Sequence, residues 1–485
     1  MDQNQNDEQY GQPREPIDPS ESGAGSDRPV RRYSLSVLLS TLCIAVLASV
    51  MLTYTLTASY VKGVYVEALL RKQEQVELLQ SALLKVEGEK SDKLQFLAAL
   101  FEASSYYADK VSEEERLNAV LKAYAASTGD AYAEYYTEEE YAVFAEENVG
   151  QYNGLGVSVV REPVHVDGYD YEAFRVISVF KDSPAASGGI KDGDYIYAVK
   201  VDGAYVGIAA LGGYSSALQV IRGEDGTVAE LLVFRATENG YEALELSVVR
   251  GSYVAESVSY SMLEGDPSVG IVQISSFDMT TPEQFKAAIE ALRASGATRF
   301  VFDVRNNPGG DLMSIKAVLT YFLKEGDLIL SAVDKDGNRA RSYYAQAMLH
   351  TGDYAPCSVS REEIGMYADL DAVVLCNGNT ASAAEVFTAT MRDYGIAPIV
   401  GEVTFGKGIM QSIISLSDVS RGIYDGYVKM TTYAYLTKSG VTYHEIGISP
   451  DEEVALSEEA MGYGFYFLPQ AVDDQLQAAV AALNR

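Results

Sequence analysis

Residues 300–312 read FVFDVRNNPGGDL, and this stretch decides the fold class. A nearly continuous apolar run is typical of a strand buried on both faces, and the Asn-Pro-Gly-Gly turn that ends it precedes an expected helix. Residues 372–386, AVVLCNGNTASAAEV, repeat this pattern of strand, turn and Ala-rich helix. Strands and helices alternate from about residue 268 to residue 435. The sequence therefore predicts a mixed α/β core whose chemistry lies where strands end in these turns.

Three residue types at these turns can carry chemistry. Ser382 is expected at the amino end of the second helix, where the helix dipole and unpaired N–H groups favour negative charge on a serine oxygen. A serine in that place is more often a simple helix cap. Gly309 and Gly310 can turn bare N–H groups toward a developing oxyanion. Lys407 lies between two glycines in residues 401–411, GEVTFGKGIMQ, whereas most lysines lie on the surface.

Residues 151–250 predict a β-rich unit, with strand signals at residues 174–180 and 195–201. A Gly-Leu-Gly-Val loop comes first, SPAASGGIKDGDYI follows at residues 183–196, and Val-Asp-Gly ends the series at residue 203. This ordered series resembles a PDZ domain of the bacterial protease type. Successive N–H groups of such a loop bind a peptide carboxylate, while the peptide adds a strand to the sheet edge. The resemblance assigns this peptide-binding loop to Gly154, Leu155, Gly156 and Val157.

The catalytic segments together resemble the C-terminal processing peptidases, also called tail-specific proteases, of the S41 serine peptidases. The shared features are the Arg-x-Asn-Pro-Gly-Gly turn, the Ser-containing turn that ends in Glu, the Thr-Phe-Gly-Lys-Gly loop with Gln four residues later, and Gly-Ile-Ser-Pro-Asp at residues 447–451. The resemblance covers roughly residues 95–480, with the PDZ-like unit inserted where this family has it. It implies an α/β (mixed α+β) protease core and a peptidase activity.

The resemblance also implies roles for single residues. Ser382 is the expected nucleophile, Lys407, 25 positions later, is the expected general base, and Gln411 is expected to orient the lysine. The oxyanion hole is expected from backbone N–H groups, which the resemblance assigns to Ala383 and to either Gly309 or Gly310. Two acidic positions are expected to support the site, namely Glu385 and Asp393.

One departure from the family pattern is visible at Asn379 and Thr380, where the family usually has Gly-Ser. Threonine keeps a hydroxyl and asparagine tolerates left-handed dihedrals, so altered detail rather than lost activity is expected. Arg222, in a stretch that resembles a PDZ element able to contact the catalytic core, is a candidate switch residue or an ordinary surface arginine.

The small number of histidines is consistent with a lysine rather than a histidine as the catalytic base. The chain has only three histidines, His165, His350 and His444, in no zinc-binding arrangement, which argues against a zinc hydrolase. A lysine normally titrates near ~10.4 and must be neutral to act as a base, and burial in an apolar site lowers its pKa by roughly 3 units or more. A Ser-Lys mechanism needs no metal or cofactor, so none is expected.

The overall composition bounds the classes of function. With 485 residues, 47% hydrophobic and 22% charged, the chain predicts about three globular units. A net charge of −32 disfavours nucleic acid as a partner. The odd number of cysteines excludes a full disulfide framework, and both a Cys357–Cys376 bridge and two separate thiols fit the sequence.

The amino-terminal part predicts a membrane anchor. Residues 1–32 are expected to be a disordered cytoplasmic tail, and the 29 residues 33–61 contain no charge, enough for one transmembrane helix. Arginines at 28, 31 and 32 favour a cytoplasmic amino terminus, although basic residues also follow the span. Residues 62–485 are therefore expected outside the cell membrane.

The predicted domains follow from these segments. A helical region at 62–150 precedes the PDZ domain at 151–252, the protease core at 253–456 and a tail at 457–485 that ends in a short helix. A leucine stripe in the helical part at 64–125 predicts either a coiled coil that forms a homodimer or a helix packed on its own domain.

The expected function is a membrane-anchored endopeptidase that recognises the C-termini of protein or peptide substrates. Two alternatives remain, a PDZ-gated signalling protease with one dedicated partner and a non-catalytic PDZ scaffold. The presence of Ser382, Lys407 and Gln411 together argues against the scaffold.

Overall fold

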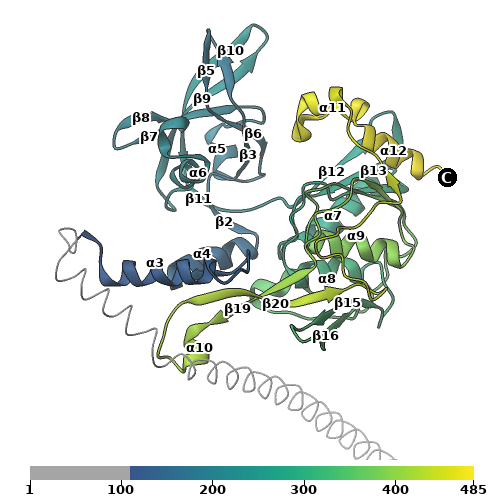
Figure 1. Ribbon diagram of the computed structural model, residues 1–485. Helices are drawn as coiled ribbons and strands as arrows, with labels where there is room; N and C mark the ends of the chain where they lie inside the picture. Colours follow the sequence, from purple (N-terminus) through teal and green to yellow (C-terminus); the bar gives the residue numbers. More distant parts are fainter. Residues whose placement is uncertain (1–109) are drawn as a thin grey trace, which may run out of the picture. The chain divides into compact units, whose positions relative to one another are not determined.

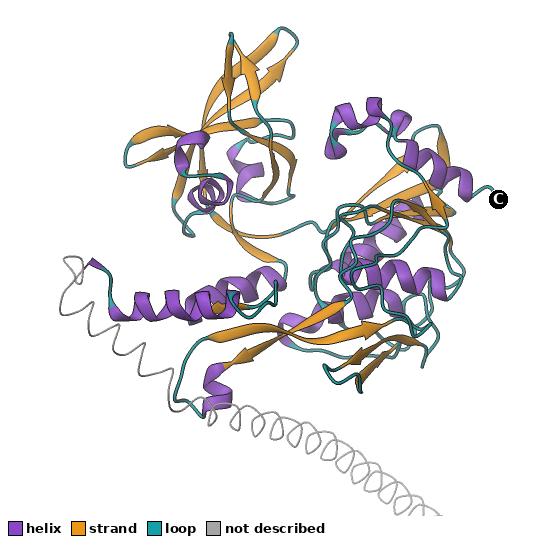
Figure 2. Cartoon of the chain, in the orientation of Figure 1, coloured by secondary structure: helices purple, strands orange, loops and turns teal. Residues whose placement is uncertain are grey.

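The computed structural model describes residues 110–485, and a six-stranded sheet organises their largest part (Figures 1 and 2). Its order is β12-β13-β14-β17-β18-β21. Only β12 (Val258–Leu263) runs antiparallel to its neighbour, and the other strands pair in parallel. These are β13 (Asp266–Ile274), β14 (Arg299–Asp303), β17 (Asp371–Cys376), β18 (Ile399–Gly401) and β21 (Glu452–Glu453). The predicted mixed α/β fold is confirmed.

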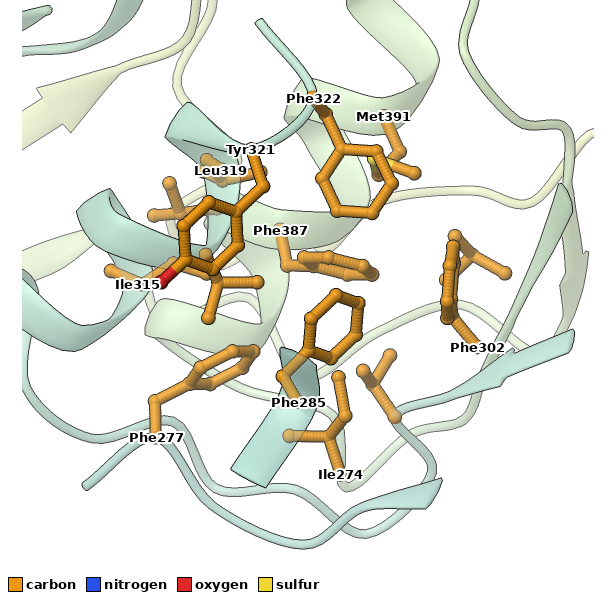
Figure 3. Packing of buried hydrophobic residues seen from close by; sticks show 14 of the residues in the cluster. Ile274, Phe277, Phe285, Phe302, Ile315, Leu319, Tyr321, Phe322, Phe387 and Met391 are labelled. Atoms are coloured by element: carbon orange, nitrogen blue, oxygen red, sulfur yellow. The ribbon is translucent and has the colours of Figure 1, made fainter. Parts of the chain in front are cut away.

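The sheet is covered on both faces, as the apolar runs predict. Along β14, Phe300 and Phe302 pack into the core formed with α7 (Thr281–Ala294), α8 (Leu312–Thr320) and α9 (Ala383–Asp393). Figure 3 shows the rings of Phe285, Phe302, Phe322 and Phe387 gathered in this core. Val301, between the two phenylalanines, faces the opposite cluster with α12 (Asp474–Ala482). The strand period of two thus divides one apolar run between two cores.

A second sheet, entirely antiparallel, supplies the loop that carries Lys407. Its strands are β1 (Glu134–Tyr136), β15 (Leu328–Val333), β16 (Arg339–Tyr344), β19 (Ile409–Ser415) and β20 (Tyr427–Leu436). β20 pairs with β1, β15 and β19, so an amino-terminal strand joins a sheet built from residues some 200 to 300 positions later. The short helix α10 (Leu416–Ser420) connects β19 and β20.

Residues 151–254 form a β-rich unit with its own apolar core. The sheet order is β10-β9-β7-β6-β3, with β8 (Ala204–Gly207) paired to β7. The main strands are β3 (Val157–Arg161), β6 (Phe174–Val179), β7 (Tyr195–Val201), β9 (Val228–Thr237) and β10 (Gly240–Val249). Two helices complete it, α5 (Pro184–Gly188) and α6 (Tyr214–Arg222). The entering strand β2 (Gln151–Gly154) pairs with the leaving strand β11 (Gly251–Val254), as expected for an inserted unit.

The ends of the described chain agree only partly with the predicted helical region. Helices α3 (Glu113–Ala126) and α4 (Glu138–Asn148) are separated by strand β1, which the sequence analysis did not predict. The carboxyl-terminal tail contains α11 (Glu458–Tyr463), two short 3₁₀ turns and the expected final helix, α12. The predicted tail at 1–32, the anchor at 33–61 and the leucine stripe lie outside the described residues. Within residues 110–485, none of the helices has the length and apolar character that crossing a bilayer requires.

The two described cysteines resolve the alternative left open above. Cys357 and Cys376 are both buried and both free thiols. Cys376 ends β17, and Cys357 donates a hydrogen bond to the Met279 carbonyl at 3.5 Å. Burial raises the pKa of each thiol to about 12, so both stay protonated and unreactive at neutral pH. We therefore interpret both cysteines as structural residues of the core.

Candidate active site

The two strand-end turns meet at the carboxyl edge of the central sheet. The N–H of Ala381 donates to the carbonyl of Asn307 at 2.9 Å, and the Thr380 hydroxyl donates to the Val304 carbonyl at 2.8 Å. Gly309 packs so closely that an added Cβ would lie 2.6 Å from Ser382 Cβ. Glycine is therefore required at 309 because a side chain there would displace Ser382.

The unusual Asn-Thr pair preserves this turn. Thr380 Oγ1 also accepts the N–H of Asn377 at 3.0 Å, and Asn379 Nδ2 donates to Asn306 Oδ1 at 2.8 Å. Asn377 Nδ2 donates to the same oxygen at 2.9 Å. Asn379 and Thr380, which depart from the family pattern, thus connect the two turns. This agrees with the expectation that the substitutions change the contacts of the turn without abolishing activity.

The backbone of Ser382 has an unfavourable conformation that its surroundings must stabilise. It is half-buried, precedes the first residue of α9, and has φ 57° and ψ −118°, a region that residues other than glycine rarely adopt. Such strain persists only where neighbouring structure imposes it, and it is frequent at active sites. The Tyr435 hydroxyl oxygen lies 3.5 Å from Ser382 Oγ. Tyr435 donates at 2.8 Å to the carbonyl of Lys407.

Glu385 connects the serine turn to the lysine loop. Its Oε2 accepts the N–H of Ser382 at 2.9 Å and the N–H of Lys407 at 2.7 Å. Its Oε1 accepts the N–H of Gly406 at 2.7 Å and the Thr404 hydroxyl at 2.6 Å. The carboxyl group is fully buried, and burial raises its pKa although all four hydrogen bonds act in the other direction. One carboxylate therefore fixes the backbone on both sides of the candidate dyad.

Lys407 is half-buried, and its pKa is lowered from the ordinary value of a lysine. Burial is the main cause, and the charge of Lys429 adds to it, whereas Asp130 and Glu385 act in the opposite direction. Lys407 Nζ lies 4.2 Å from the centre of the Tyr132 ring. A lysine in this setting is easier to deprotonate than one on the surface.

Ser382, Lys407 and Gln411 line one cleft of about 660 Å³. Its apolar lining includes Met279, Leu312, Met313, Ile315 and Val386. A cleft with a nucleophilic hydroxyl, a lysine of lowered pKa and apolar walls can bind a peptide and carry out acyl transfer.

Not every predicted site residue has the expected neighbours. Gln411 lines the cleft, and its side-chain NH₂ donates to Thr431 Oγ1 at 3.0 Å, but within residues 110–485 no hydrogen bond joins its side chain to Lys407. Asp393 ends α9, eleven residues after Ser382, and its carboxylate accepts the N–H of Ser439 at 3.3 Å. Because a helix rises ~1.5 Å per residue, Asp393 lies at the opposite end of α9 from the serine. The expectation that it supports the site is corrected.

The structure distinguishes the two glycines. Gly309 N–H donates to Asn307 Oδ1 at 2.8 Å, and the fully buried Asn307 is held in turn by the Ile274 carbonyl at 2.8 Å. In the described part of the chain, the N–H groups of Gly310 and Ala383 have no protein acceptor. Both residues line the cleft beside Ser382. These two groups are thus available to an oxyanion.

The predicted peptide-binding loop lies at a second groove. A groove of about 230 Å³ in the β-rich unit is lined by Leu155, Gly156 and Val157, and by Leu218 and Ile221 of α6. Gly154 does not line it, because it pairs with Gly251 at the end of β2. Arg222 lies on the groove wall.

Sequence reasoning missed Tyr132, Tyr435 and Asp130. Asp130 accepts the N–H of Thr431 at 2.7 Å, which fixes the turn that places Tyr132 against Lys407. These residues come from an amino-terminal turn and from β20, and they have no motif of their own. The pairing of β1 with β20, which brings Asp130 and Tyr132 to the site, is a long-range contact without a local sequence pattern.

Comparison with known proteins places the chain in one family. The sequence profile of peptidase family S41 matches residues 268–454. The carboxy-terminal processing protease CtpA of Bacillus subtilis strain 168 is 30% identical over 371 residues, covering 76% of this chain and 70% of the relative. CtpB of the same organism is 27% identical over 349 residues, covering 72% of this chain and 64% of the relative.

A solved structure agrees with the fold. An S41 protease of Bacteroides fragilis NCTC 9343 matches with a TM-score of 0.50 and 14% identity, covering 80% of this chain and 97% of that one. The extent of the match to CtpA, together with the S41 profile, leads to one conclusion. The chain belongs to peptidase family S41, among the C-terminal processing serine peptidases.

Proposed function

We propose that this peptidase is a membrane-anchored endopeptidase that uses Ser382 as nucleophile and Lys407 as general base, and that a PDZ domain at residues 151–252 recognises substrate C-termini. The observation that carries the dyad is the shared carboxylate of Glu385, which holds the backbone N–H groups of Ser382 and Lys407 on one oxygen. The pKa of Lys407 is lowered, mainly by burial, and this direction favours the neutral form that a general base needs.

The proposed reaction is an acyl transfer through a serine ester. Lys407 Nζ takes the Ser382 proton while Oγ attacks the scissile carbonyl, and the oxyanion is held by the N–H groups of Ala383 and Gly310. The C–N bond then breaks, and Lys407 returns the proton to the leaving amine. Water, deprotonated by the same lysine, hydrolyses the ester and restores Ser382.

One observation favours a gated form of this enzyme. Within the described residues, Lys407 Nζ contacts the Tyr132 ring and makes no hydrogen bond with Ser382 Oγ. The two side chains must therefore come into hydrogen-bonding geometry before Lys407 can accept the serine proton. This supports the alternative of a PDZ-gated signalling protease with one dedicated partner, whose binding would bring the dyad together.

Recognition of C-termini is supported by the shape of the β-rich unit. Strand β3 is the edge strand of its sheet, so its outer side can pair with an added peptide strand. The groove between β3 and α6 begins at the Gly-Leu-Gly loop, whose Gly156 has φ 77°. An added Cβ at Gly156 would lie 2.3 Å from Ser183 Cβ, which explains the need for glycine in this loop.

This recognition predicts a preference for a free carboxylate. In a Ser382→Ala background, which prevents cleavage, a fluorescent peptide with an apolar free C-terminus should bind at least about 10-fold more tightly than its C-terminal amide, since charge-assisted hydrogen bonds are lost. Leu218→Asp, in the groove, should remove that preference. Leu244→Asp, on the distant edge strand β10, is the matched control. Equal affinity for acid and amide in fluorescence anisotropy would contradict C-terminal recognition.

The membrane anchor, the extracytoplasmic location and a homodimer remain part of the proposal. Residues 33–61 are the proposed span, supported by their length and lack of charge. The proposed substrates are unfolded or loosely folded protein C-termini outside the cell membrane.

A further inference from the structure

A second cavity of about 590 Å³ lies next to the catalytic cleft and has no assigned role. It shares Lys407 and Pro308 with the cleft, but it lacks Ser382, Gly310 and Ala383. The two cavities therefore meet at Lys407 and Pro308, and only the cleft also reaches Ser382 and the candidate oxyanion donors. The one with the free N–H groups faces the acyl part of the substrate, because the oxyanion must lie there.

The chemistry of the proposed reaction assigns a direction to the second cavity. The leaving amine must lie beside Lys407, because that lysine returns the proton to it. A cavity that Lys407 lines, and that the oxyanion donors do not, is on the leaving-group side. The residue that follows the scissile bond therefore passes over this cavity.

The contacts of the carboxyl-terminal tail independently indicate that the second cavity lies on the leaving-group side of the dyad. Tyr466 lines the second cavity, and the ring of the next residue, Phe467, lies 3.3 Å below the guanidinium of Arg175. Arg175 belongs to β6, which pairs with the edge strand β3 of the proposed PDZ domain. A substrate whose C-terminus is held at β3 approaches the dyad from this side, since the leaving group is its C-terminal part.

The lining of the cavity indicates which side chain it accepts. Phe405 is 58% exposed and Tyr466 is 48% exposed, unusual for aromatic rings beside a catalytic lysine. The Phe405 backbone is rigid, because its N–H donates to the Thr380 carbonyl at 2.9 Å and both neighbouring residues are bonded to Glu385. Tyr132 and Pro308 add further apolar surface, and the residues lining this cavity include no carboxylate.

We propose that this cavity is the leaving-group subsite and selects a large apolar or aromatic side chain in the residue immediately after the scissile bond. The inference rests on the Ser382/Lys407 mechanism proposed above and adds a specificity to it. Aromatic side chains bury area against Phe405 and Tyr466, and ring pairs add a preference for offset or edge-to-face contacts. The lining offers no carboxylate to pair with a lysine or arginine side chain at this position.

Partition of the acyl-enzyme tests this subsite separately from acylation. The full chain in mild detergent is given an activated p-nitrophenyl ester, and amino acid amides compete with water for the acyl-enzyme. The amine nitrogen attacks the acyl carbon and forms an amide, while the bond from that carbon to Ser382 Oγ breaks. Lys407 transfers one proton from the amine to Ser382 Oγ. We expect phenylalanine amide to capture the acyl group about 10-fold better than glycine amide or lysine amide, the scale of apolar pocket discrimination.

Variants connect the preference to the cavity. Phe405→Ala and Tyr466→Ala should each bring the ratio of phenylalanine amide to glycine amide toward one. Tyr424→Ala removes an aromatic ring that is 56% exposed elsewhere and should leave the ratio unchanged. Equal capture of the two amides, or a ratio that survives Phe405→Ala, would overturn the subsite. The assay is run with an apolar free-acid peptide that fills the groove of the β-rich unit, and failure to release p-nitrophenol under that condition would instead overturn the serine mechanism, with which the subsite would fall.

Discussion

Replacing Lys407 with alanine is expected to lower kcat for peptide hydrolysis by about 10³-fold, the usual contribution of a general base. A serine hydroxyl is a poor nucleophile without an adjacent base. The backbone N–H groups of Lys407 and Ser382 both donate to Glu385 Oε2. The pKa of the Lys407 side chain is lowered by burial and by the charge of Lys429. Steady-state kinetics on a quenched fluorescent peptide measure the loss.

The pH dependence separates the role of base from a structural role. Lys407 acts when neutral, so kcat/KM of the parent should rise with pH through the lowered pKa and level off below the ordinary lysine value of 10.5. Its surroundings act in both directions, because Lys429 lowers this pKa while Asp130 and Glu385 raise it. Lys438→Ala, a lysine stacked 3.6 Å from the Tyr394 ring centre, is the matched control. If kcat/KM of Lys407→Ala still rose with pH in the same way, the rise would have to be assigned to another titrating group.

Glu385→Gln is expected to destabilise the fold by about 3 kcal/mol and to reduce kcat by about 10²-fold. The carboxylate accepts four hydrogen bonds, two on each oxygen. An amide has one accepting oxygen, so two buried donors must lose their acceptor and face an NH₂ group. If the NH₂ group replaces Oε2, the backbones of Ser382 and Lys407 are both displaced.

Urea unfolding and peptide kinetics on the same preparation measure both effects. Glu402→Gln makes the same exchange on the strand end before the lysine loop and should change neither quantity appreciably. An unfolding midpoint of Glu385→Gln equal to that of the parent would contradict the account of this carboxylate as the connection between the two loops.

The local parts of this site could be read from the sequence. The strand at 300–303 and the turn after it were predictable because apolar runs and Pro-Gly-Gly turns are short-range patterns. The same holds for the position of Ser382 before α9. Its positive φ angle of 57° followed from no pattern in the sequence, because Ser382 is surrounded by Gly309 and by Glu385, which accepts its N–H, only in the folded chain.

The rest depends on contacts between distant segments. Tyr132 reaches Lys407 because β1 pairs with β20, and a three-residue strand between two acidic helices gives almost no periodic pattern. The proposal of Gly310 rather than Gly309 as oxyanion donor rests on one hydrogen bond, from the Gly309 N–H to Asn307 Oδ1. The position of Asp393 at the far end of α9 follows from its eleven-residue distance from Ser382, so the error lay in giving more weight to the family resemblance than to the helix rise.

Proteolysis of casein by the full chain and by its Ser382→Ala variant tests the central claim most directly. Casein is unfolded and presents many peptide bonds, so cleavage does not depend on one sequence. Because Ser382→Ala removes only the nucleophilic oxygen, the account predicts fragments from the parent and none from the variant, with both proteins showing the same circular dichroism. Casein fragments that continue to form with Ser382→Ala, at a rate near that of the parent, would contradict it.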